Sequence, residues 1–437
     1  MVEGGSEVIY TTRTTCRVCD SSDLVPLFSL GTQAVSDFVP ADKIHAGQQC
    51  PIELELCSCC TLVQARHTAE QEFLYRRFYW FKSGCTQTLR DALTEAALTA
   101  QQRANLQPGD VVLDIGSNDS TMLRAYTTPG IIRVGCEPAT NLAAEARQGI
   151  DCLIREFWSY LEYSLALYLD KRTTRWERLP KAKIITAFGM LYDSEYPNAF
   201  IGDVAKALAP DGLFVAQLMC LKQTIDKGDV GNFAHEHLLF FSLRSLEYLL
   251  GKHGLEIFDV EENDVNGGSY RLYCGHKGNK TLWTPKGFSR KCWAIQSEKD
   301  MRLGDPDTYA AFFPRMQANR NACVSYLREQ RAAGKRIWIL GASTKGNVIA
   351  QWYGFDAGLI EAAAERSPEK VGLHMVGTGI PIRSEAEFRA AKPDIAVILP
   401  YSFAPEIMER ERAFREAGGV FCVPLPSFKV VWPQEGT

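Results

Sequence analysis

The stretch VVLDIGSNDS, residues 111–120, decides the fold of this 437-residue chain. Its apolar residues, interrupted by Asp114, predict a buried strand, Gly116 opens a loop, and a helix is expected from Thr121. An apolar strand that runs into a loop of small polar residues and then a helix is the first unit of a doubly wound sheet. The loop holds one glycine where a dinucleotide fingerprint has three, so a pyrophosphate could not approach the backbone as closely. The stretch therefore predicts a Rossmann-like α/β domain and argues against a dinucleotide.

An acidic residue follows the next predicted strand. Residues 131–136 predict that strand, and Glu137 stands at its tip, where a carboxylate can accept both hydroxyls of a ribose. Together with the acidic first loop, this position favours a cationic cofactor without phosphate, such as S-adenosylmethionine (SAM). The alternative is an ordinary strand–helix–strand unit without a ligand. A helix is expected over residues 141–148, ended by Gly149. The candidate cofactor-binding residues are Asp114, Gly116, Ser117, Asn118, Asp119, Glu137, Pro138 and Asn141.

The sheet continues further along the chain. We expect the segment FGMLYDSEYP to expose Tyr192 and Asp193 at the ligand side of the sheet, and Ser242 to cap a helix. A turn at Asn266-Gly267-Gly268 joins the last two strands. A closing hairpin of this kind is typical of SAM-dependent methyltransferases and gives their sheet an antiparallel end strand. The further strands are expected at residues 183–187, 213–218, 255–260 and 269–273.

Two of the seven histidines lie in the segment FAHEHLLF, residues 233–240. An imidazole is a fitting base for a proton next to a ketone. We predict this role for the segment, with Glu236 placed to orient the base or to contact a substrate hydroxyl. Two alternatives stay open: the histidines are structural, or His235 and His237 bind a metal, for which a third ligand is missing.

Four cysteines near the start of the chain have the spacing of a metal site. Cys16-x-x-Cys19 and Cys57-x-x-Cys60 are separated by thirty-seven residues, and two such turns can complete a tetrahedron of thiolates around Zn²⁺. All four positions are cysteine, so no position remains for a catalytic water and the zinc is expected to be structural. The alternative is unpaired thiols at chance spacing. Between the two turns, residues 30–40 predict a loop and a short strand.

An aromatic segment and a second strand–loop–helix unit complete the motifs. Residues 75–84, YRRFYWFKSG, either pack between domains or bring Tyr79 over the active site as a lid or phenol donor. Residues 336–340 predict a strand and GASTKGN, residues 341–347, a loop in which small residues and a lysine at a helix start favour a phosphate. The alternative is a tight turn for strand–helix packing. Between the units, residues 286–329 are charged and prone to form helices, and later strands are expected at residues 395–399 and 420–423.

The composition limits the class of protein. A chain of 437 residues is too long for one ordinary core, so two or three domains are expected. The net charge of −4 disfavours bulk attraction to nucleic acid or to an anionic membrane. No apolar run approaches the roughly 18 residues that span a bilayer, and the first residues lack the apolar core of a signal peptide. We expect a cytoplasmic protein, monomeric or weakly dimeric.

The order of these motifs resembles the sugar C-methyltransferase family. The two CxxC pairs, VLDIGSNDS, GCEPATN, LAPDGLFV, HEH, NGGS and GASTKGN carry the resemblance, which covers roughly residues 13–430. It implies an α/β protein with a zinc-binding domain over residues 10–75, a SAM-binding methyltransferase domain over residues 76–285, and a Rossmann-like domain over residues 286–437 that helps to hold a nucleotide-linked sugar.

The resemblance also implies a reaction: methyl transfer to a carbon next to the keto group of a nucleotide-linked 4-keto-deoxysugar, through an enolate, with C3 favoured over C5. His237 is then the base, assisted by Glu236 and Tyr79. The implied substrate-binding residues are His235, Tyr192, Asn266, Arg271, Ser343, Thr344, Lys345 and Asn347. An oxygen acceptor or a ketone that is not a sugar is the alternative. An NAD-dependent enzyme and a zinc ribbon that binds nucleic acid are disfavoured by the single-glycine loop and the net charge.

The chain departs from the family pattern around the expected substrate. Ala234 stands where a tyrosine usually precedes HEH, so a phenol needed there must come from Tyr79 or Tyr192. Ser120 replaces a usual glycine, and Asn266 stands where histidine is common.

Overall fold

The strand predicted at VVLDI is β7, Val111–Ile115, which lies inside a seven-stranded sheet. The computed structural model describes residues 10–171 and 173–433. The strand order is β15-β16-β13-β12-β7-β8-β9, and β16 runs antiparallel to both of its neighbours. The antiparallel end predicted from the turn at Asn266 is therefore present. The remaining strands of this sheet are β8 Ile132–Cys136, β9 Cys152–Ile154, β12 Ala182–Phe188, β13 Leu208–Met219, β15 Leu255–Asn263 and β16 Ser269–His276.

Alternate residues of β7 face two helical layers. Val112 packs in a core with Leu89 and Leu93 of α1 and Met122 of α2. Leu113 belongs to a second core that holds residues of α5, α7 and α8 on the other face. Because both faces are covered, the strand is apolar except for Asp114 instead of alternating with polar residues. These helices are α1 Gln87–Arg103, α2 Thr121–Ala125, α5 Pro197–Ala207, α7 Leu243–Lys252 and α8 Pro285–Asp300.

The N-terminal part is built around an antiparallel sheet of four strands, in the order β14-β5-β4-β2. The sequence predicts a loop and a short strand at residues 30–40. Residues 30–34 instead complete the long strand β2, Leu24–Ala34, and the short strand is β3, Phe38–Val39. Gly31, at φ +81°, lies where the register of β2 shifts against β4, and this bulge makes the stretch look irregular in sequence. The other strands are β4 Gln49–Cys57, β5 Val63–Ala65 and β14 Leu239–Phe240, and a separate pair joins β1 Tyr10–Thr12 to β6 His67–Ala69.

The C-terminal part is a six-stranded sheet, in the order β20-β18-β17-β21-β22-β23, in which only the last strand is antiparallel. The helices that precede it, predicted from the charged segment, are α8 and α9, Pro306–Ala332. The α/β fold class with three parts is thereby confirmed. The strands are β17 Ile337–Leu340, β18 Ala362–Glu365, β20 Ile382–Ser384, β21 Ile395–Ile398, β22 Val420–Val423 and β23 Lys429–Val431, and the helices that cover them are α10 Thr344–Tyr353, α11 Glu385–Ala391, α12 Ala404–Arg410 and α13 Arg412–Glu416.

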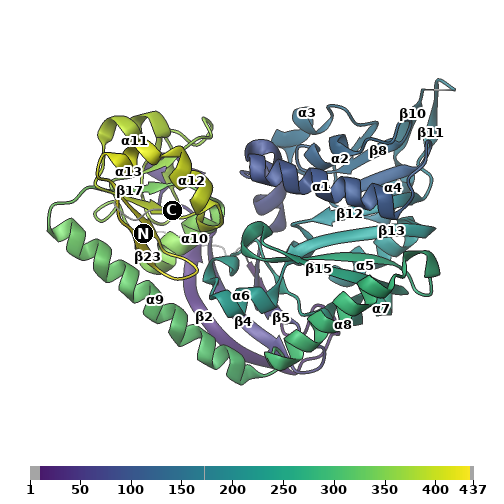
Figure 1. Ribbon diagram of the computed structural model, residues 1–437, viewed down its shortest axis with the longest axis horizontal. Coiled ribbons are helices and arrows are strands. Elements are labelled where there is room, and N and C mark those ends of the chain that lie inside the picture. Colours follow the sequence, from purple (N-terminus) through teal and green to yellow (C-terminus); the bar gives the residue numbers. More distant parts are fainter. Residues whose placement is uncertain (1–9, 172, 434–437) are drawn as a thin grey trace, which may run out of the picture.

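Smaller elements complete the chain. The predicted helix over residues 141–148 is shorter than expected: a 3₁₀ turn at Thr140–Leu142 leads into α3, Ala143–Ala146. The hairpin of β10, Leu167–Asp170, and β11, Arg175–Arg178, extends from the central part after α4, Tyr160–Leu165. Figure 1 shows this hairpin at the far edge of the molecule from the C-terminal sheet.

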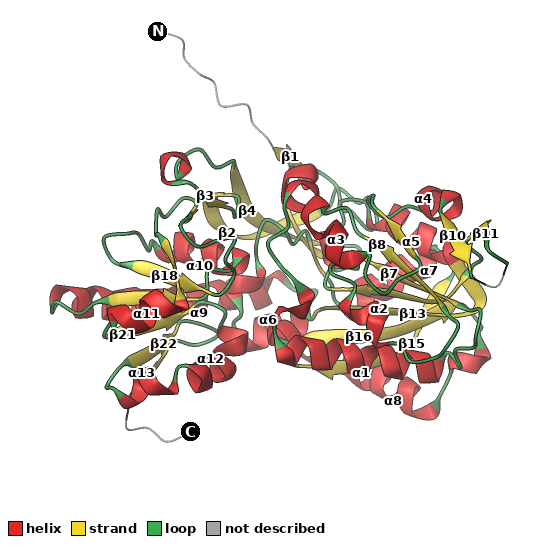
Figure 2. Cartoon of the chain, turned by 90° about the horizontal axis from the view of Figure 1, so that it is seen from above, coloured by secondary structure: helices red, strands yellow, loops and turns green. Residues whose placement is uncertain are grey.

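The N-terminal sheet joins the other two parts. Strand β14 follows the HEH segment of the central part and pairs with β5. Strand β3, Phe38–Val39, pairs with β19, His374–Met375, of the C-terminal part. In Figure 1 the purple strands β2 and β4 lie between the two halves, and Figure 2 shows these halves side by side with α6, Leu221–Lys227, between them. Each α/β half is therefore held against a common N-terminal sheet.

One buried arginine fastens this sheet to the central part. Arg17, 2% exposed, donates from Nε to Glu195 Oε2 at 2.9 Å and from Nη1 to the carbonyl of Ala65 at 2.5 Å. Its third bond goes to Thr68 Oγ1 at 2.7 Å. Burial lowers the pKa of Arg17, which the neighbouring Glu195 opposes. The guanidinium is stable in this buried place because each of its three nitrogens donates to an acceptor.

We expect Arg17→Met to lower the free energy of unfolding by about 3–5 kcal/mol, because the change leaves the Glu195 carboxylate without its buried partner. Urea denaturation measures the difference. The matched control is Arg13→Met, since Arg13 lies 3.4 Å from the same carboxylate but is partly exposed, and it should cost about 0–1 kcal/mol. Equal effects of the two substitutions would contradict the role given to Arg17.

Candidate active site

A cavity of about 690 Å³ lies where the central and C-terminal parts meet. One wall follows the ends of β7, β8 and β12, where ligands bind in open α/β sheets. The opposite wall is made by residues 343–345 and 399–403 of the C-terminal part. We call this space the central cavity.

At the β7 end, buried carboxylates shape the cavity wall. Asp114 accepts a hydrogen bond from Thr186 Oγ1 at 2.6 Å, and burial raises the pKa of this carboxyl to about 7. Glu137 accepts from the backbone N–H groups of Asn118 and Ala139, both at 2.8 Å. The two loops are thereby held in fixed positions around the carboxylate at the strand tip.

Gly116 has to be glycine in this loop. Its φ is +69°, and a Cβ built on it would lie 2.9 Å from Met190 Cγ. A side chain would both strain the backbone and fill the space beside the strand tip. The loop therefore leaves room for a ligand to approach the main chain.

The predicted cofactor-binding residues separate into two groups. Six line the central cavity, namely Asp114, Gly116, Ser117, Asn118, Glu137 and Pro138. Asp119 and Asn141 do not: Asp119 Oδ2 accepts from the N–H of Gly84 at 2.7 Å, and Asn141 bonds both the N–H and the carbonyl of Tyr79. These two side chains hold the aromatic segment 75–84 against the sheet.

That aromatic segment covers the cavity. Tyr75 and Tyr79 both line it, with ring centroids 5.9 Å apart. Tyr75 was missed by the sequence reasoning; its hydroxyl donates to the carbonyl of Glu236 at 2.6 Å. Tyr79 and Tyr192 both line the cavity, and within the described part of the chain no hydrogen bond of either hydroxyl is found, so both phenols are available to a ligand. Ala234 is buried and lies off the cavity wall.

Pairing on both sides fixes the HEH segment. Leu238 donates its N–H to the carbonyl of Tyr192 at 2.9 Å, and its own carbonyl accepts from the N–H of Ala65 at 2.9 Å. The expectation that Tyr192 and Asp193 are exposed is therefore wrong: they are 4% and 9% exposed, since the HEH segment covers them. Both nevertheless line the central cavity.

His237 carries a neutral imidazole on the cavity wall. Its Nδ1–H donates to the carbonyl of Asn232 at 2.6 Å, and among the described residues Nε2 has no hydrogen-bond partner. Burial, helped by the charge of Lys345, lowers the pKa of His237 to about 3. The Tyr192 ring meets the imidazole edge-on, with centroids 4.9 Å apart. The arrangement therefore leaves the Nε2 lone pair free to accept a proton.

Two acidic side chains, Glu236 and Asp193, line the same cavity as this imidazole. Glu236 Oε2 accepts from Thr344 Oγ1 at 3.4 Å, and burial raises the pKa of Glu236. Asp193, which the sequence reasoning did not single out as a site residue, also lines the cavity. Its pKa is raised well above the ordinary value, first by burial and then by Glu236. Burial therefore disfavours a negative charge on both side chains, while the nearby ammonium group of Lys345 favours it and lowers both pKa values.

Three predicted substrate-binding residues do not line the cavity. His235 donates from Nε2 to the carbonyl of Cys50 at 2.9 Å and so fastens the HEH segment to β4. Arg271, on β16, lies opposite Gln217 of β13. Its guanidinium donates to Gln217 Oε1 at 2.9 Å and to Glu95 Oε2 at 2.5 Å, so its charge is already paired. Asn347 is fully buried in α10. The five predicted residues that line the cavity are Tyr192, Asn266, Ser343, Thr344 and Lys345.

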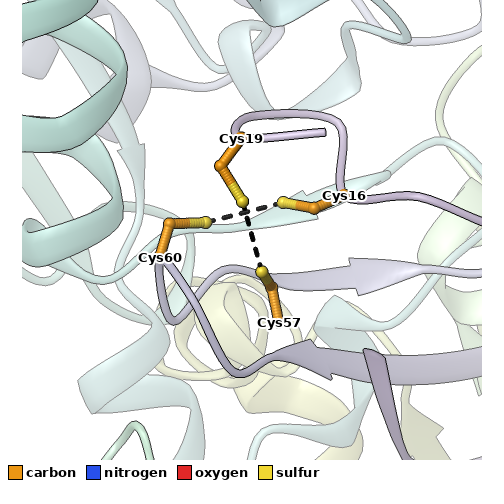
Figure 3. Close-up of side chains that lie close together, drawn as sticks. All are labelled: Cys16, Cys19, Cys57 and Cys60. Atoms are coloured by element: carbon orange, nitrogen blue, oxygen red, sulfur yellow. Dashed lines mark hydrogen bonds between the residues drawn. The ribbon is translucent and has the colours of Figure 1, made fainter. Parts of the chain in front are cut away.

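The four predicted cysteine ligands converge on one point (Figure 3). Their sulfur atoms all lie within 4.8 Å of one another, with Cys16 and Cys60 3.5 Å apart and Cys19 and Cys57 3.4 Å apart. Zinc–sulfur bonds of about 2.3 Å in a tetrahedron need sulfurs spaced about 3.8 Å apart, so the donor set fits this metal.

Three family models match consecutive parts of the chain. They describe a zinc binding domain (residues 16–75), a methyltransferase domain (residues 85–260) and a C-methyltransferase C-terminal domain (residues 264–426). The C-methyltransferase NovU of Streptomyces niveus is 27% identical over 421 residues, covering 95% of this chain and 96% of that protein.

Solved structures match only in part. Magnesium protoporphyrin IX methyltransferase (ChlM) of Synechocystis PCC 6803 with bound SAH is 14% identical, with a TM-score of 0.33, covering 45% of this chain and 91% of that chain. A SAM-dependent methyltransferase of Clostridium acetobutylicum is 13% identical, with a TM-score of 0.32, and the match covers 43% of this chain and 92% of that chain. Scores this low carry no argument about the reaction.

The sheet order, the cavity at its ligand side and the four-cysteine site define a zinc-binding, SAM-dependent methyltransferase. More specifically, the chain is a SAM-dependent C-methyltransferase with an N-terminal zinc-binding domain, a central methyltransferase domain and a C-terminal C-methyltransferase domain. The resemblance to C-methyltransferases is thus confirmed, while the domain limits at residues 75 and 285 remain our proposal. Within the described residues, no helix has the length and apolar character needed to cross a membrane.

We expect Cys60→Ser to remove most of the bound zinc and to lower Tm by roughly 5 °C or more, because the metal holds together cysteines that belong to the main core. Metal analysis of the purified protein and thermal melting measure both effects. The matched control is the exposed neighbour, Cys59→Ser, which should keep the zinc. Retention of zinc in the Cys60 variant would contradict the ligand assignment.

A pH prediction follows from His235. Burial lowers its pKa to about 4, against about 6.5 when unfolded, so the unfolded state gains a proton first as the pH falls. Its contribution to stability is therefore complete above about pH 6.5 and is lost progressively toward pH 4. Between pH 7 and pH 5 this loss is about 1–2 kcal/mol, and His235→Gln should remove it. Urea denaturation at both values measures the difference, with exposed His45→Gln as the control that retains the wild-type loss.

Proposed function

We propose that this enzyme methylates a carbon next to the keto group of a nucleotide-linked 4-keto-deoxysugar, with C3 favoured over C5. The observation that carries the proposal is the neutral imidazole of His237, whose Nε2 is free on the wall of a cavity shared by the cofactor end and the C-terminal domain. The relative NovU, named as a C-methyltransferase, supports carbon as the acceptor. The proposal extends this to a sugar through the sequence resemblance described above.

The residues at the β7 end fit the cofactor. Gly116 leaves space at the loop, Glu137 presents a carboxylate at the second strand tip, and Asp114 is buried beneath them. SAM, when bound, supplies an electrophilic methyl group. Its positive charge suits this acidic end of the cavity, and a diphosphate would be repelled from it.

His237 supplies the base. The Nδ1–H bond to the carbonyl of Asn232 fixes the tautomer, so Nε2 carries the lone pair that takes the proton from the carbon next to the ketone. The electron pair of the broken C–H bond moves into an enolate, and the enolate carbon would form the new bond to the methyl group as the methyl–sulfur bond of SAM breaks and its electrons stay on the sulfur. Glu236, one residue away, and the free phenols of Tyr79 and Tyr192 are placed to contact substrate hydroxyl and keto groups.

The C-terminal wall is proposed to hold the sugar ring of the substrate. Ser343 and Thr344 begin α10, and Tyr401 and Phe403 line the cavity beside them. The Tyr401 hydroxyl donates to Asp229, so this part of the wall is fastened to the central domain. A sugar held here lies in the same cavity as the cofactor, which lowers the entropic cost of bringing the two together.

We expect His237→Gln to slow exchange of the substrate proton next to the ketone by about 10²–10⁴-fold, since exchange needs the base but no methyl donor. Nuclear magnetic resonance in D₂O without SAM follows this exchange in a set of nucleoside-diphosphate 4-keto-6-deoxyhexoses. Calorimetry should show unchanged binding of SAM, and His45→Gln should exchange like the wild type. Exchange at the wild-type rate in the His237 variant would refute the assignment, and methylation of a hydroxyl without any exchange would favour the oxygen acceptor.

A further inference from the structure

Lys345 reaches from the C-terminal domain to the base. The first turn of α10 places its Nζ 3.0 Å from Asn232 Oδ1 and 3.5 Å from Met219 Sδ, at the end of β13. The main-chain carbonyl of the same Asn232 accepts the Nδ1–H of His237. One residue therefore holds both the ammonium group and the imidazole, and fixes them relative to each other.

The charges around the cavity argue against a phosphate at this lysine. Lys345 is the one lysine or arginine among the described residues that line the cavity. Burial lowers the pKa of Lys345, and the carboxylates of Asp229, Glu236 and Asp193, in that order, oppose this by raising it. A diphosphate placed beside Lys345 would meet these carboxylates and be repelled. The acidic residues that line the cavity are Glu72, Asp114, Glu137, Asp193, Glu195, Asp203 and Glu236.

A neutral acceptor fits the same place. A ketone oxygen brings no net charge into the acidic cluster, and an ammonium group can donate to it while it keeps its bond to Asn232. Lys345 is half-buried and the surface it exposes faces the cavity. It is therefore available at the position where negative charge develops when a neighbouring base removes a proton.

The weak basicity of His237 also requires a group that stabilises the enolate. A buried imidazole beside a fixed cation holds a proton weakly, as the low pKa of His237 shows. Such a base can remove a carbon-bound proton only where the resulting enolate is strongly stabilised. The cation that weakens the base also stabilises the product of its action.

We infer that Lys345 is a catalytic residue that donates a hydrogen bond to the keto oxygen and stabilises the enolate. This role rests on the proposed function. The proton moves from the carbon to His237 Nε2, the C–H electron pair forms the C=C bond, the π pair of the carbonyl moves onto the keto oxygen, and Lys345 remains protonated throughout. The sequence-based expectation of a phosphate at this lysine is replaced by a role at the reacting carbonyl.

The test compares Lys345→Met with the wild type in the D₂O exchange experiment, using the 4-keto-6-deoxyhexose that the wild type exchanges fastest. At saturating sugar, exchange should fall by about 10²–10³-fold, as for the loss of one oxyanion donor, while the Kd of the sugar changes little. Lys345→Arg, which keeps the charge, should retain part of the rate. Lys335→Met, at an exposed lysine before β17, is the matched control and should exchange like the wild type.

The outcomes separate the two proposals. If Lys345→Met, shown to be folded by circular dichroism, exchanges at the wild-type rate when saturated, or if its loss lies wholly in Kd, the lysine binds substrate without stabilising an enolate and the inference is refuted. If wild-type enzyme methylates its acceptor but exchanges no proton with any sugar of the set, the proposed function fails, and the role of Lys345 fails with it.

Discussion

The pairing of β14 with β5 is the constraint on which the active site depends. These two short strands put the main chain directly after HEH into the sheet of the zinc-binding domain. On the other side of the same segment, Leu238 is bonded to Tyr192, so the loop that carries His237 is held between two domains. Without this clamp, the HEH segment between α6 and α7 would have more conformations, and a base must be held within a few tenths of an ångström to be effective.

The zinc site gains its importance from this connection. Cys57 ends β4 and Cys60 lies three residues before β5, so the metal fixes the turn that presents β5 to β14. The cysteines also share a core with the central sheet. In the proposed mechanism, zinc would therefore act at a distance: it offers no open ligand position to the reaction, but it fixes the strand against which the HEH segment pairs.

The site is shared among the three domains. In the proposed mechanism the central domain provides the cofactor end and the base, the segment that follows the zinc domain provides the aromatic cover, and the C-terminal domain provides Lys345. Asn232 is where these contributions meet, because it bonds Lys345 through its side chain and His237 through its main chain. The position of the C-terminal domain is thus coupled directly to the orientation of the His237 imidazole. A change in the packing of the two domains would therefore also move this imidazole.

The sequence by itself determined the elements with strong local signals: the buried strand and loop at Val111–Ile115, the four cysteines at fixed spacing, the antiparallel hairpin and the HEH segment. Their chemistry is local, so spacing and polarity are enough to show it. Only the tertiary structure decided which residues share the cavity. Arg271, His235 and Asn347 do not line the cavity, whereas Tyr75 and Asp193 do. Lys345 lies near carboxylates that are distant from it in sequence. The physical reason is that burial and charge at a site depend on contacts between distant segments, which no local pattern records.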